Sequence, residues 1–360
     1  MPFDFCHDAC HSLATMSELW TPNNNDGNFV VVVNDGSTSH LRAKAAVGEL
    51  EIEYGDRVKR VKTERDRNET RKRLVQALND GPVAGIIIAG GDGTDSTVTE
   101  ILMMSPDISD ELRRTTITSL YGGNGNLGPN QLTPVPYRGV PSLIKILQTA
   151  KPVDVHPLVA SFKHEDEEQQ EIIALYCADI GLGGLTVDKL ERRRKIAKSK
   201  HKNLNERDNV LAFVSAFKEA PVFSYARFYE DKNGERTERT YDDEQPAYGI
   251  FGVNGSRIGQ YAHVPTELAD PEFFVSILRD KRISRVTSDV AKILFHHPSG
   301  EHIKDFGVFS CVIKTKEDFI WGETDGEPHV LRDGTEVKFS RHQKSCRFNT
   351  TNPRLLKSAA

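Results

Sequence analysis

Residues 86–100 read IIIAGGDGTDSTVTE and decide the fold of this chain. An apolar run ends in two glycines, an aspartate and a third glycine, and a helical pattern follows. Consecutive glycines let the backbone turn sharply and let a phosphate approach its N–H groups without a Cβ in the way. The N-terminus of the following helix adds partial positive charge. The stretch therefore predicts a phosphate-binding turn between a buried strand and a helix.

Asp92 is the unexpected residue of this turn, because a carboxylate repels a phosphate. It fits if a Mg²⁺ ion lies between the carboxylate and the phosphates. Thr94 could supply a hydroxyl or cap the helix. An ordinary tight turn is the competing interpretation, since glycine and aspartate are common in turns. The apolar strand directly before the turn favours the phosphate site.

The first half of the chain alternates short apolar strands with helical patterns. This order predicts a parallel sheet covered by helices. Ligands of such sheets bind beyond the carboxyl ends of the strands. The expected strands are 28–34, 57–64, 84–91 and 116–123, and the expected helices are 39–50, 68–78, 97–104 and 140–149.

After about residue 150 the pattern changes to strand after strand, with one helix expected at 205–220. Asn233-Gly234 stands between two alternating runs and predicts a hairpin. The fold class is therefore α/β plus β: an N-terminal parallel-sheet α/β nucleotide-binding domain with a C-terminal β-rich, sandwich-like domain. The expected divisions are an extension at 1–26, the α/β domain at 27–150, the β-rich domain at 151–350 and a tail at 351–360.

Composition limits the class of protein. The longest apolar stretches, such as FVVVV at 29–33, are far shorter than the roughly 18–20 residues of a membrane-spanning helix. Five cysteines without a CxxC pair indicate reduced thiols, and the first 20 residues lack the apolar core of a signal peptide. A net charge of -5 gives no reason to expect nucleic acid. We therefore expect a cytoplasmic protein.

GGDGT resembles the nucleotide-binding motif shared by diacylglycerol kinases, sphingosine and ceramide kinases, NAD kinases and, more distantly, phosphofructokinases. Further motifs occur in the order of the diacylglycerol-kinase-like family, and the set spans about residues 28 to 350. They are Asn34-Asp35-Gly36-Ser37, Thr63, Gly123-Asn124-Gly125-Asn126, CADIGLGG (177–184), VNGSRIGQ (253–260) and Asp325-Gly326-Glu327.

The resemblance implies a kinase that binds ATP and Mg²⁺. It would phosphorylate a hydroxyl of a lipid such as diacylglycerol, a sphingoid base or ceramide, or of a related small molecule. Glu327, from the β-rich substrate domain, would be the general base that takes the proton of the attacking hydroxyl. Asp92 would organise the catalytic Mg²⁺, and Asp270 is implied as a ligand of a structural Mg²⁺. The implied ATP contacts are Asn34, Thr63, Gly90, Gly91, Asp92, Gly93, Thr94, Gly123 and Asn124.

The chain also departs from the family pattern. Leu127 stands where the family's Gly-Thr-Gly-Asn-Asp has its final aspartate, and Asn124 replaces the threonine. Ser96-Thr97 replaces the usual Asn-Glu after GGDGT, and Phe274 replaces the second aspartate of the Asp270 stretch. These changes leave the acceptor and the structural Mg²⁺ undetermined.

Two other functions are compatible with the motifs. An NAD kinase shares GGDGT, but its Asn-Glu motif after the fourth strand is absent from the sequence. A catalytically inactive nucleotide-binding protein would have no reason to keep Glu327. The basic run at 191–202 could contact an anionic bilayer, although a solvated helix face is the favoured interpretation. Peripheral membrane contact and a homodimer are left open.

Overall fold

The structure is a computed structural model of the 360-residue chain. The residues that it describes are 27–35, 40–64, 66–121, 127–133, 143–163, 169–199, 206–220, 227–232, 235–239, 247–258, 262–264, 266–270, 272–278, 303–308, 310–314, 319–325, 327–332 and 335–358.

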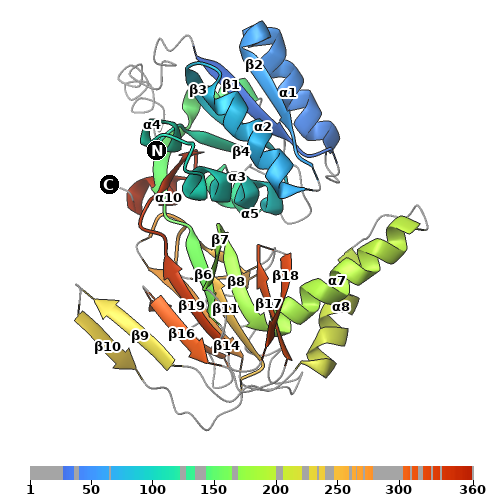
Figure 1. The fold of residues 1–360 in the computed structure, drawn as a ribbon, viewed down its shortest axis with the longest axis vertical. Helices are drawn as coiled ribbons and strands as arrows, with labels where there is room; N and C mark the ends of the chain where they lie inside the picture. Colours follow the sequence, from blue (N-terminus) through green and yellow to red (C-terminus); the bar gives the residue numbers. More distant parts are fainter. Residues whose placement is uncertain are drawn as a thin grey trace, which may run out of the picture.

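The first sheet forms the upper part of the molecule in Figure 1. Its strands β2, β1, β3, β4 and β20 are paired in parallel, and β5 pairs antiparallel to β20. The central strands are runs of valine and isoleucine, as expected of strands buried on both faces. In spatial order the strands are β2 (Val58–Lys62), β1 (Asn28–Val33), β3 (Val83–Gly90), β4 (Ile117–Tyr121), β20 (Cys346–Thr350) and β5 (Lys151–Val155).

Helices cover both faces of this sheet (Figure 1). Alternate residues of β1 divide between two hydrophobic clusters: Val31 packs with α1 and α6, and Val32 packs with α2, α3 and α5. The helices of this part are α1 (His40–Tyr54), the 3-10 helix η1 (Gly55–Arg57), α2 (Arg67–Asn79), α3 (Asp92–Met104), α4 (Asp110–Arg113), α5 (Leu127–Leu132), α6 (Leu143–Thr149) and α10 (Pro353–Ser358).

Two antiparallel sheets form the lower part. Their inner faces share one hydrophobic cluster, which includes Phe162 and Phe339 of one sheet and Phe273 of the other. The second sheet contains β10 (Glu235–Arg239), β9 (Arg227–Lys232), β16 (Ser310–Lys314), β19 (Glu336–Arg341), β6 (Leu158–Lys163) and β7 (Gln170–Ala174). The third contains β15 (Ile303–Val308), β14 (Phe273–Leu278), β11 (Gly249–Val253), β8 (Cys177–Gly181), β17 (Phe319–Thr324) and β18 (Glu327–Arg332).

Smaller elements complete the described fold. β12 (Arg257–Ile258) and β13 (Ala262–His263) form a two-stranded pair. The helices α7 (Leu182–Ser199) and α8 (Glu206–Glu219) pack together and project from the sandwich (Figure 1). Over the part of the chain that the structure describes, no helix combines the length and apolar character needed to span a membrane.

The predicted fold class is confirmed: a parallel-rich α/β sheet is followed by antiparallel sheets. The strands on either side of the predicted hairpin pair antiparallel, Lys232 with Glu235, whereas Asn233 and Gly234 themselves lie outside the described residues. One helix begins earlier than expected, because α3 starts at Asp92 rather than at residue 97. Two strands of the first sheet, β5 and β20, come from beyond residue 150, so this sheet includes residues from both sides of the predicted boundary. The predicted domain limits stay a prediction.

Candidate nucleotide site and acidic row

Three residues assigned to nucleotide binding follow neighbouring strands at one edge of the first sheet. Asn34 follows β1, and its backbone N–H donates to the carbonyl of Ala89 at 3.1 Å. Thr63 follows β2, and its N–H donates to the carbonyl of Val33 at 2.9 Å. Gly90 ends β3. The structure thus brings these residues together at the carboxyl ends of parallel strands, where such sheets bind ligands.

The GGDGT turn is tightly packed on one side and open on the other. A Cβ on Gly90 would overlap the side chain of Thr94, which is 4% exposed. Thr94 does not cap α3, whose N-cap is Gly91; its hydroxyl accepts a hydrogen bond from Asn34 Nδ2 at 3.1 Å. Beyond its chain neighbours and the backbone of its own helix, a Cβ on Gly93 would meet no atom of the described residues within 4 Å. The open side therefore leaves room for a phosphate at the N-terminus of α3.

Asp92 is the first residue of α3 and is half-buried. Its Oδ1 accepts hydrogen bonds from the N–H groups of Leu127 at 2.6 Å and Gly128 at 3.4 Å. No described residue donates to Oδ2. Burial raises the pKa of Asp92 to about 6, although the two backbone donors lower it. One oxygen is thus held in place, while the other has no hydrogen-bond donor among the described residues and keeps its capacity to bind a cation.

This arrangement fits a Mg²⁺ ion brought with a nucleotide. Within the described ranges, no group of three or more His, Cys, Asp or Glu side chains is placed to hold a metal. Mg²⁺ is usually bound by one or two carboxylates together with substrate phosphates and waters, rather than by an all-protein cage. A single carboxylate with one open oxygen, beside the open face of Gly93, meets that requirement.

Asp95 lies one turn after Asp92 and is 1% exposed. The Ser119 hydroxyl lies 2.9 and 2.8 Å from its Oδ1 and Oδ2, and the Tyr176 hydroxyl donates to Oδ2 at 2.7 Å. Burial, followed by the charge of Asp92, raises the pKa of Asp95 well above its usual value. Burial also raises the pKa of Tyr176. Asp95 therefore joins the start of α3 to β4 and to the turn between β7 and β8.

Asp325 follows β17 with a φ of 48°, in the left-handed region that few residues other than glycine adopt. Its carboxylate accepts from the N–H groups of Leu175 at 2.5 Å, Tyr176 at 2.9 Å and Cys177 at 2.8 Å, and from the Ser96 hydroxyl. Burial raises the pKa of Asp325 to about 7, although these four donors lower it. Asp325 therefore fastens the third sheet to α3.

Glu323 and Asp179 face each other on the paired strands β17 and β8, and each is 5% exposed. The Cys177 thiol donates to Glu323 Oε1 at 3.3 Å. Burial, followed by the charge of Glu323, raises the pKa of Asp179, and no described residue donates to Asp179 Oδ1. We call five carboxyl groups the acidic row: Asp92 and Asp95 on α3, Asp325 directly after β17, and Glu323 and Asp179 on the paired strands β17 and β8.

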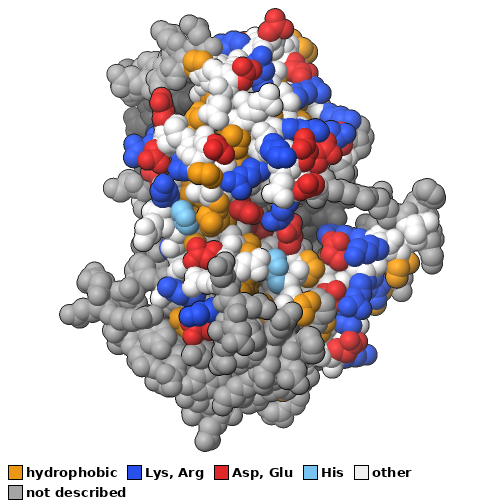
Figure 2. Space-filling view, in the orientation of Figure 1, with side chains coloured by type: hydrophobic (Ala, Val, Ile, Leu, Met, Phe, Trp, Pro, Cys, Tyr) orange, Lys and Arg blue, Asp and Glu red, His pale blue; other side chains and the backbone are white. Residues whose placement is uncertain are grey.

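Glu327 lies outside the acidic row, at the start of β18. Its side chain is 45% exposed and pairs with Arg67, which also pairs with Glu100 at 3.1 Å. Figure 2 shows acidic and basic side chains next to one another at the level where the upper part meets the lower part. No hydrogen bond or ion pair within the described residues joins Glu327 to Asp92.

Asp270 lies apart from these contacts, in the turn before β14. Its Oδ2 accepts from the N–H of Glu267 at 2.7 Å, and its carbonyl accepts from Arg341 Nη2 at 2.6 Å. Among the described residues, neither a hydrogen bond nor an ion pair links Asp270 to Asp92. The structure therefore does not bring the two predicted metal ligands together.

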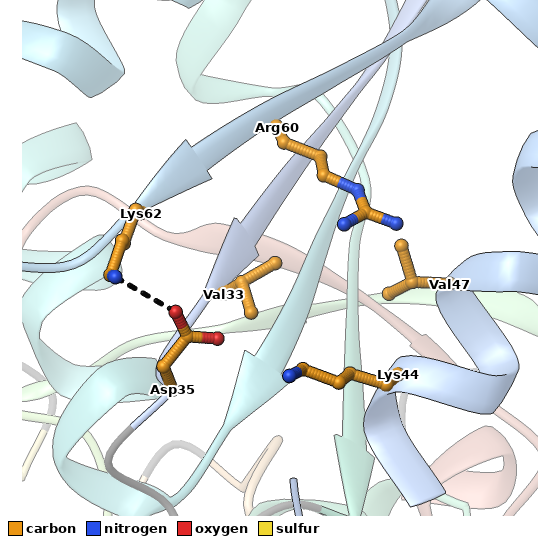
Figure 3. A pocket seen from close by; sticks show the side chains of 6 residues that line it. All are labelled: Val33, Asp35, Lys44, Val47, Arg60 and Lys62. Carbon is orange, nitrogen blue, oxygen red and sulfur yellow. Dashed lines mark ion pairs between the residues drawn. The ribbon is translucent and has the colours of Figure 1, made fainter. Parts of the chain in front are cut away.

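A pocket of about 180 Å³ lies beside β1, β2 and α1 (Figure 3). Val33, on its wall, packs with the α1 cluster, whereas the next residue, Asn34, bonds Thr94 of α3. Two of its cations are already paired, Lys62 with Asp35 at 2.9 Å and Arg60 with Glu51. The pocket therefore lies on the α1 face of the first sheet, opposite the face that α3 covers. Its lining is Val33, Asp35, Lys44, Val47, Arg60 and Lys62.

The sequence located the turn and its neighbours but missed most of the residues around them. Gly123 and Asn124 lie outside the described residues, so their assignment stays a prediction. The sequence carried no signal for the role of Asp95, because an acidic residue near the start of a helix is common and its burial is known only from the structure. The missed residues are Arg67, Asp95, Glu100, Tyr176, Asp179 and Glu323.

The fold and the turn define a class of two-part proteins in which a parallel α/β sheet carries a glycine-rich turn above an antiparallel sandwich. Residues 28–157 match the family model described as the diacylglycerol kinase catalytic domain. The matched residues make up about a third of the chain. The resemblance predicted from the motifs is thereby confirmed. The match supports a kinase of this family.

Solved structures share the fold over nearly the whole chain. A putative diacylglycerol kinase from Bacillus anthracis str. Sterne is 20% identical, with a TM-score of 0.60, and the match covers 91% of this chain and 98% of that one. Yeast NADH kinase complexed with NADH is 10% identical, with a TM-score of 0.51, and covers 93% and 87%. No curated protein matches the chain. At these identities the likeness establishes the fold alone.

Proposed function

We propose that this protein is an ATP-dependent kinase that phosphorylates a hydroxyl of a lipid, such as diacylglycerol, a sphingoid base or ceramide, or of a related small molecule. The observation that carries the proposal is the geometry of the GGDGT turn. Asp92 has one held and one open carboxylate oxygen, and Gly93 faces open space beside it. Asn34 and Thr63 end the neighbouring strands.

The phosphate donor, ATP, would lie across the carboxyl ends of these strands. Gly90, Gly91, Gly93 and Thr94 would surround the phosphates of ATP, with Asn34, Thr63, Gly123 and Asn124 as further contacts. Asp92 would hold Mg²⁺ through Oδ2, and this ion would neutralise the charge that develops on the phosphates. Asp270 is proposed only as a ligand of a separate, structural Mg²⁺, since it has no contact with Asp92 among the described residues.

The acceptor hydroxyl would approach from the side of the sandwich. Glu327 would accept its proton while the hydroxyl oxygen bonds to the γ-phosphorus, and the bond from that phosphorus to the bridging oxygen of ADP breaks. A positioned carboxylate can contribute roughly 10² to 10⁴ in rate as a general base. The remaining barrier would be lowered by orientation and charge neutralisation, which dominate phosphoryl transfer.

Asp179, one member of the acidic row, is a reason to expect polar groups on the acceptor. Asp179 is nearly fully buried, yet its Oδ1 lacks a donor among the described residues. The Gly184 N–H and the Glu323 side chain hydrogen-bond the Asp179 carboxyl group, but a buried oxygen without a donor is still costly. A hydroxyl or an amino group of the acceptor would supply that donor, which favours a lipid head group with such groups over a purely hydrocarbon ligand.

The test is transfer of labelled phosphate from γ-labelled ATP and Mg²⁺ by the purified full chain. The acceptor is supplied as a cell extract separated into lipid and aqueous fractions, and NAD and NADH are added in separate reactions. We expect label in the lipid fraction. Label in the aqueous fraction alone would overturn the lipid acceptor, and label in NADP or NADPH would replace the proposal by the NAD kinase alternative.

An inactive nucleotide-binding protein is the remaining alternative. It predicts that ATP binds in a calorimeter while no acceptor, lipid or aqueous, becomes labelled. Flotation of the same preparation with anionic vesicles tests peripheral membrane contact, and its molar mass in solution tests for a homodimer.

A further inference from the structure

Arg67 joins three segments of the chain around the proposed base. One guanidinium nitrogen, Nη2, pairs with Glu327 Oε2 at the start of β18, and Nη1 pairs with Glu100 Oε2 of α3 at 3.1 Å. The three side chains are between 35% and 45% exposed. One arginine therefore lies between two carboxylates that come from different parts of the fold.

The local sequence places Arg67 at the start of α2. Asp66 caps α2 by accepting from the N–H of Asn68 at 2.9 Å, so Arg67 is the first residue of the helix. Glu100 is eight residues after Asp92 on α3, which is about 12 Å along a helix axis. Arg67 thus pairs with the helix that begins at the proposed Mg²⁺ ligand, two turns further along.

Arg67 offsets the repulsion between the carboxylates of Glu100 and Glu327. Burial and the nearby charge of Glu327 raise the pKa of Glu100, whereas Arg67 lowers it. The two carboxylates therefore repel each other, and the guanidinium between them offsets that repulsion. Because all three groups are partly exposed, the pairs contribute little to stability. Their main effect is on the orientation of the side chains.

Orientation matters for Glu327 because its own surroundings restrain it little. It is half-exposed and stands directly after the turn set by Asp325. A glutamate has several rotatable bonds, and ordering it costs conformational entropy. Arg67 binds only Oε2, so Oε1 has no partner among the described residues and is open to a proton.

We propose that Arg67 is a positioning residue for Glu327, anchored by Glu100, and that it holds the base in one orientation at the edge of α3. This inference rests on the proposed kinase function. It adds a residue that no family motif in the sequence pointed to. Misplacing a reacting group by about 1 Å can cost roughly 100-fold in rate, so the expected loss falls on turnover rather than on substrate binding.

The experiment compares Arg67→Gln, Arg67→Lys and Glu100→Gln in the full chain. Arg73→Gln is the matched control, because Arg73 lies on the same helix, is 45% exposed and also pairs with two carboxylates, Glu64 and Glu69. We expect Arg67→Gln to lower kcat by roughly 10- to 100-fold with KM for ATP and acceptor changed less than about two-fold. Arg67→Lys should recover part of the loss, and Glu100→Gln should lose less. Arg73→Gln should match the unaltered protein.

The outcomes separate the two ideas. If the unaltered chain transfers phosphate and Arg67→Gln does so at the same kcat, the positioning role is wrong while the kinase stands. If Arg67→Gln raises KM for ATP and leaves kcat intact, Arg67 binds the nucleotide and the positioning role is again wrong. If the unaltered chain transfers no phosphate to any acceptor, the proposed function fails and the role of Arg67 fails with it.

Discussion

Asp325 shows at the scale of one residue how the two parts of the molecule are held together. It has a positive φ, lies almost out of solvent and accepts from three consecutive backbone N–H groups and from Ser96. Buried donors that lose their acceptor retain the full cost of desolvation. The Asp-Gly-Glu motif therefore contains a structural aspartate two positions before the proposed base.

Replacing Asp325 by alanine should destabilise the protein by about 2 to 4 kcal/mol, because several buried donors lose their partner together. Urea unfolding measures this change. Asp154→Ala is the control, since Asp154 is 54% exposed and, among the described residues, forms an ion pair with Arg347 alone; it should cost at most about 1 kcal/mol. An equal effect of the two substitutions would contradict the structural role of Asp325.

Stability should also depend on pH through Asp92 and Asp325. The folded pKa values, about 6 and about 7, lie above the ordinary value of 3.8. Between pH 3.8 and about 7 the unfolded chain releases these protons while the folded chain retains them. These two groups should therefore make their full contribution to the free energy of unfolding below pH 3.8. That contribution should fall as the pH rises toward 7.

Urea unfolding at a series of pH values in the absence of Mg²⁺ tests this dependence. Asp325→Asn, which cannot ionise, should show a shallower fall over the same range than the unaltered chain. Identical slopes for the two proteins would show that Asp325 titrates at its ordinary pKa in the folded state.

At the scale of elements, the sequence predicts the strands and turns that a short run of residues determines by itself. The valine run of β1 and the isoleucine run before GGDGT identify buried strands directly, and the glycines identify the turn. The short strand β20, CRFNT, carries no such pattern, yet it completes the first sheet. Contacts such as Asp325 with Leu175 join residues 150 positions apart, so no local pattern could reveal them.

The first and last of the three glycines of the turn, Gly90 and Gly93, should respond differently to replacement by alanine. Gly90→Ala should destabilise the protein, because its Cβ would overlap Thr94. Gly93→Ala should leave stability unchanged or raise it by up to about 1 kcal/mol, since alanine favours helices and its Cβ would meet no atom. The new methyl group should instead weaken ATP binding.

Thermal unfolding and ATP calorimetry on the two glycine variants check this contrast. The account is contradicted if Gly93→Ala binds ATP as tightly as the unaltered protein. It is also contradicted if Gly90→Ala unfolds at the same temperature as the unaltered protein.

At the scale of the whole molecule, the last strand makes the α/β part depend on the end of the chain. Phe348 of β20 and Leu355 of α10 are fully buried in the cluster that contains α2 and α3. A chain that ends at residue 345 should lose several kcal/mol of stability or fail to fold, since each large buried side chain contributes about 1.5 to 3 kcal/mol. A chain that ends at Ser358 should unfold at the temperature of the full chain.

Circular dichroism during heating compares these two truncations. Equal unfolding temperatures would contradict the contribution of β20, which lies between β4 and β5, to the stability of the first sheet. They would favour a division of the chain in which residues 27–150 form a self-sufficient domain.

We propose that Asp92 and Glu327, from the two parts of the fold, act together in phosphoryl transfer. Rapid-quench measurement of label transfer from γ-labelled ATP to the acceptor tests it most directly, in the unaltered chain, Asp92→Asn and Glu327→Gln. We predict that each substitution lowers the rate of transfer by at least roughly 100-fold while the protein remains folded and Glu327→Gln still binds ATP. Near-normal transfer by either folded variant would contradict the account.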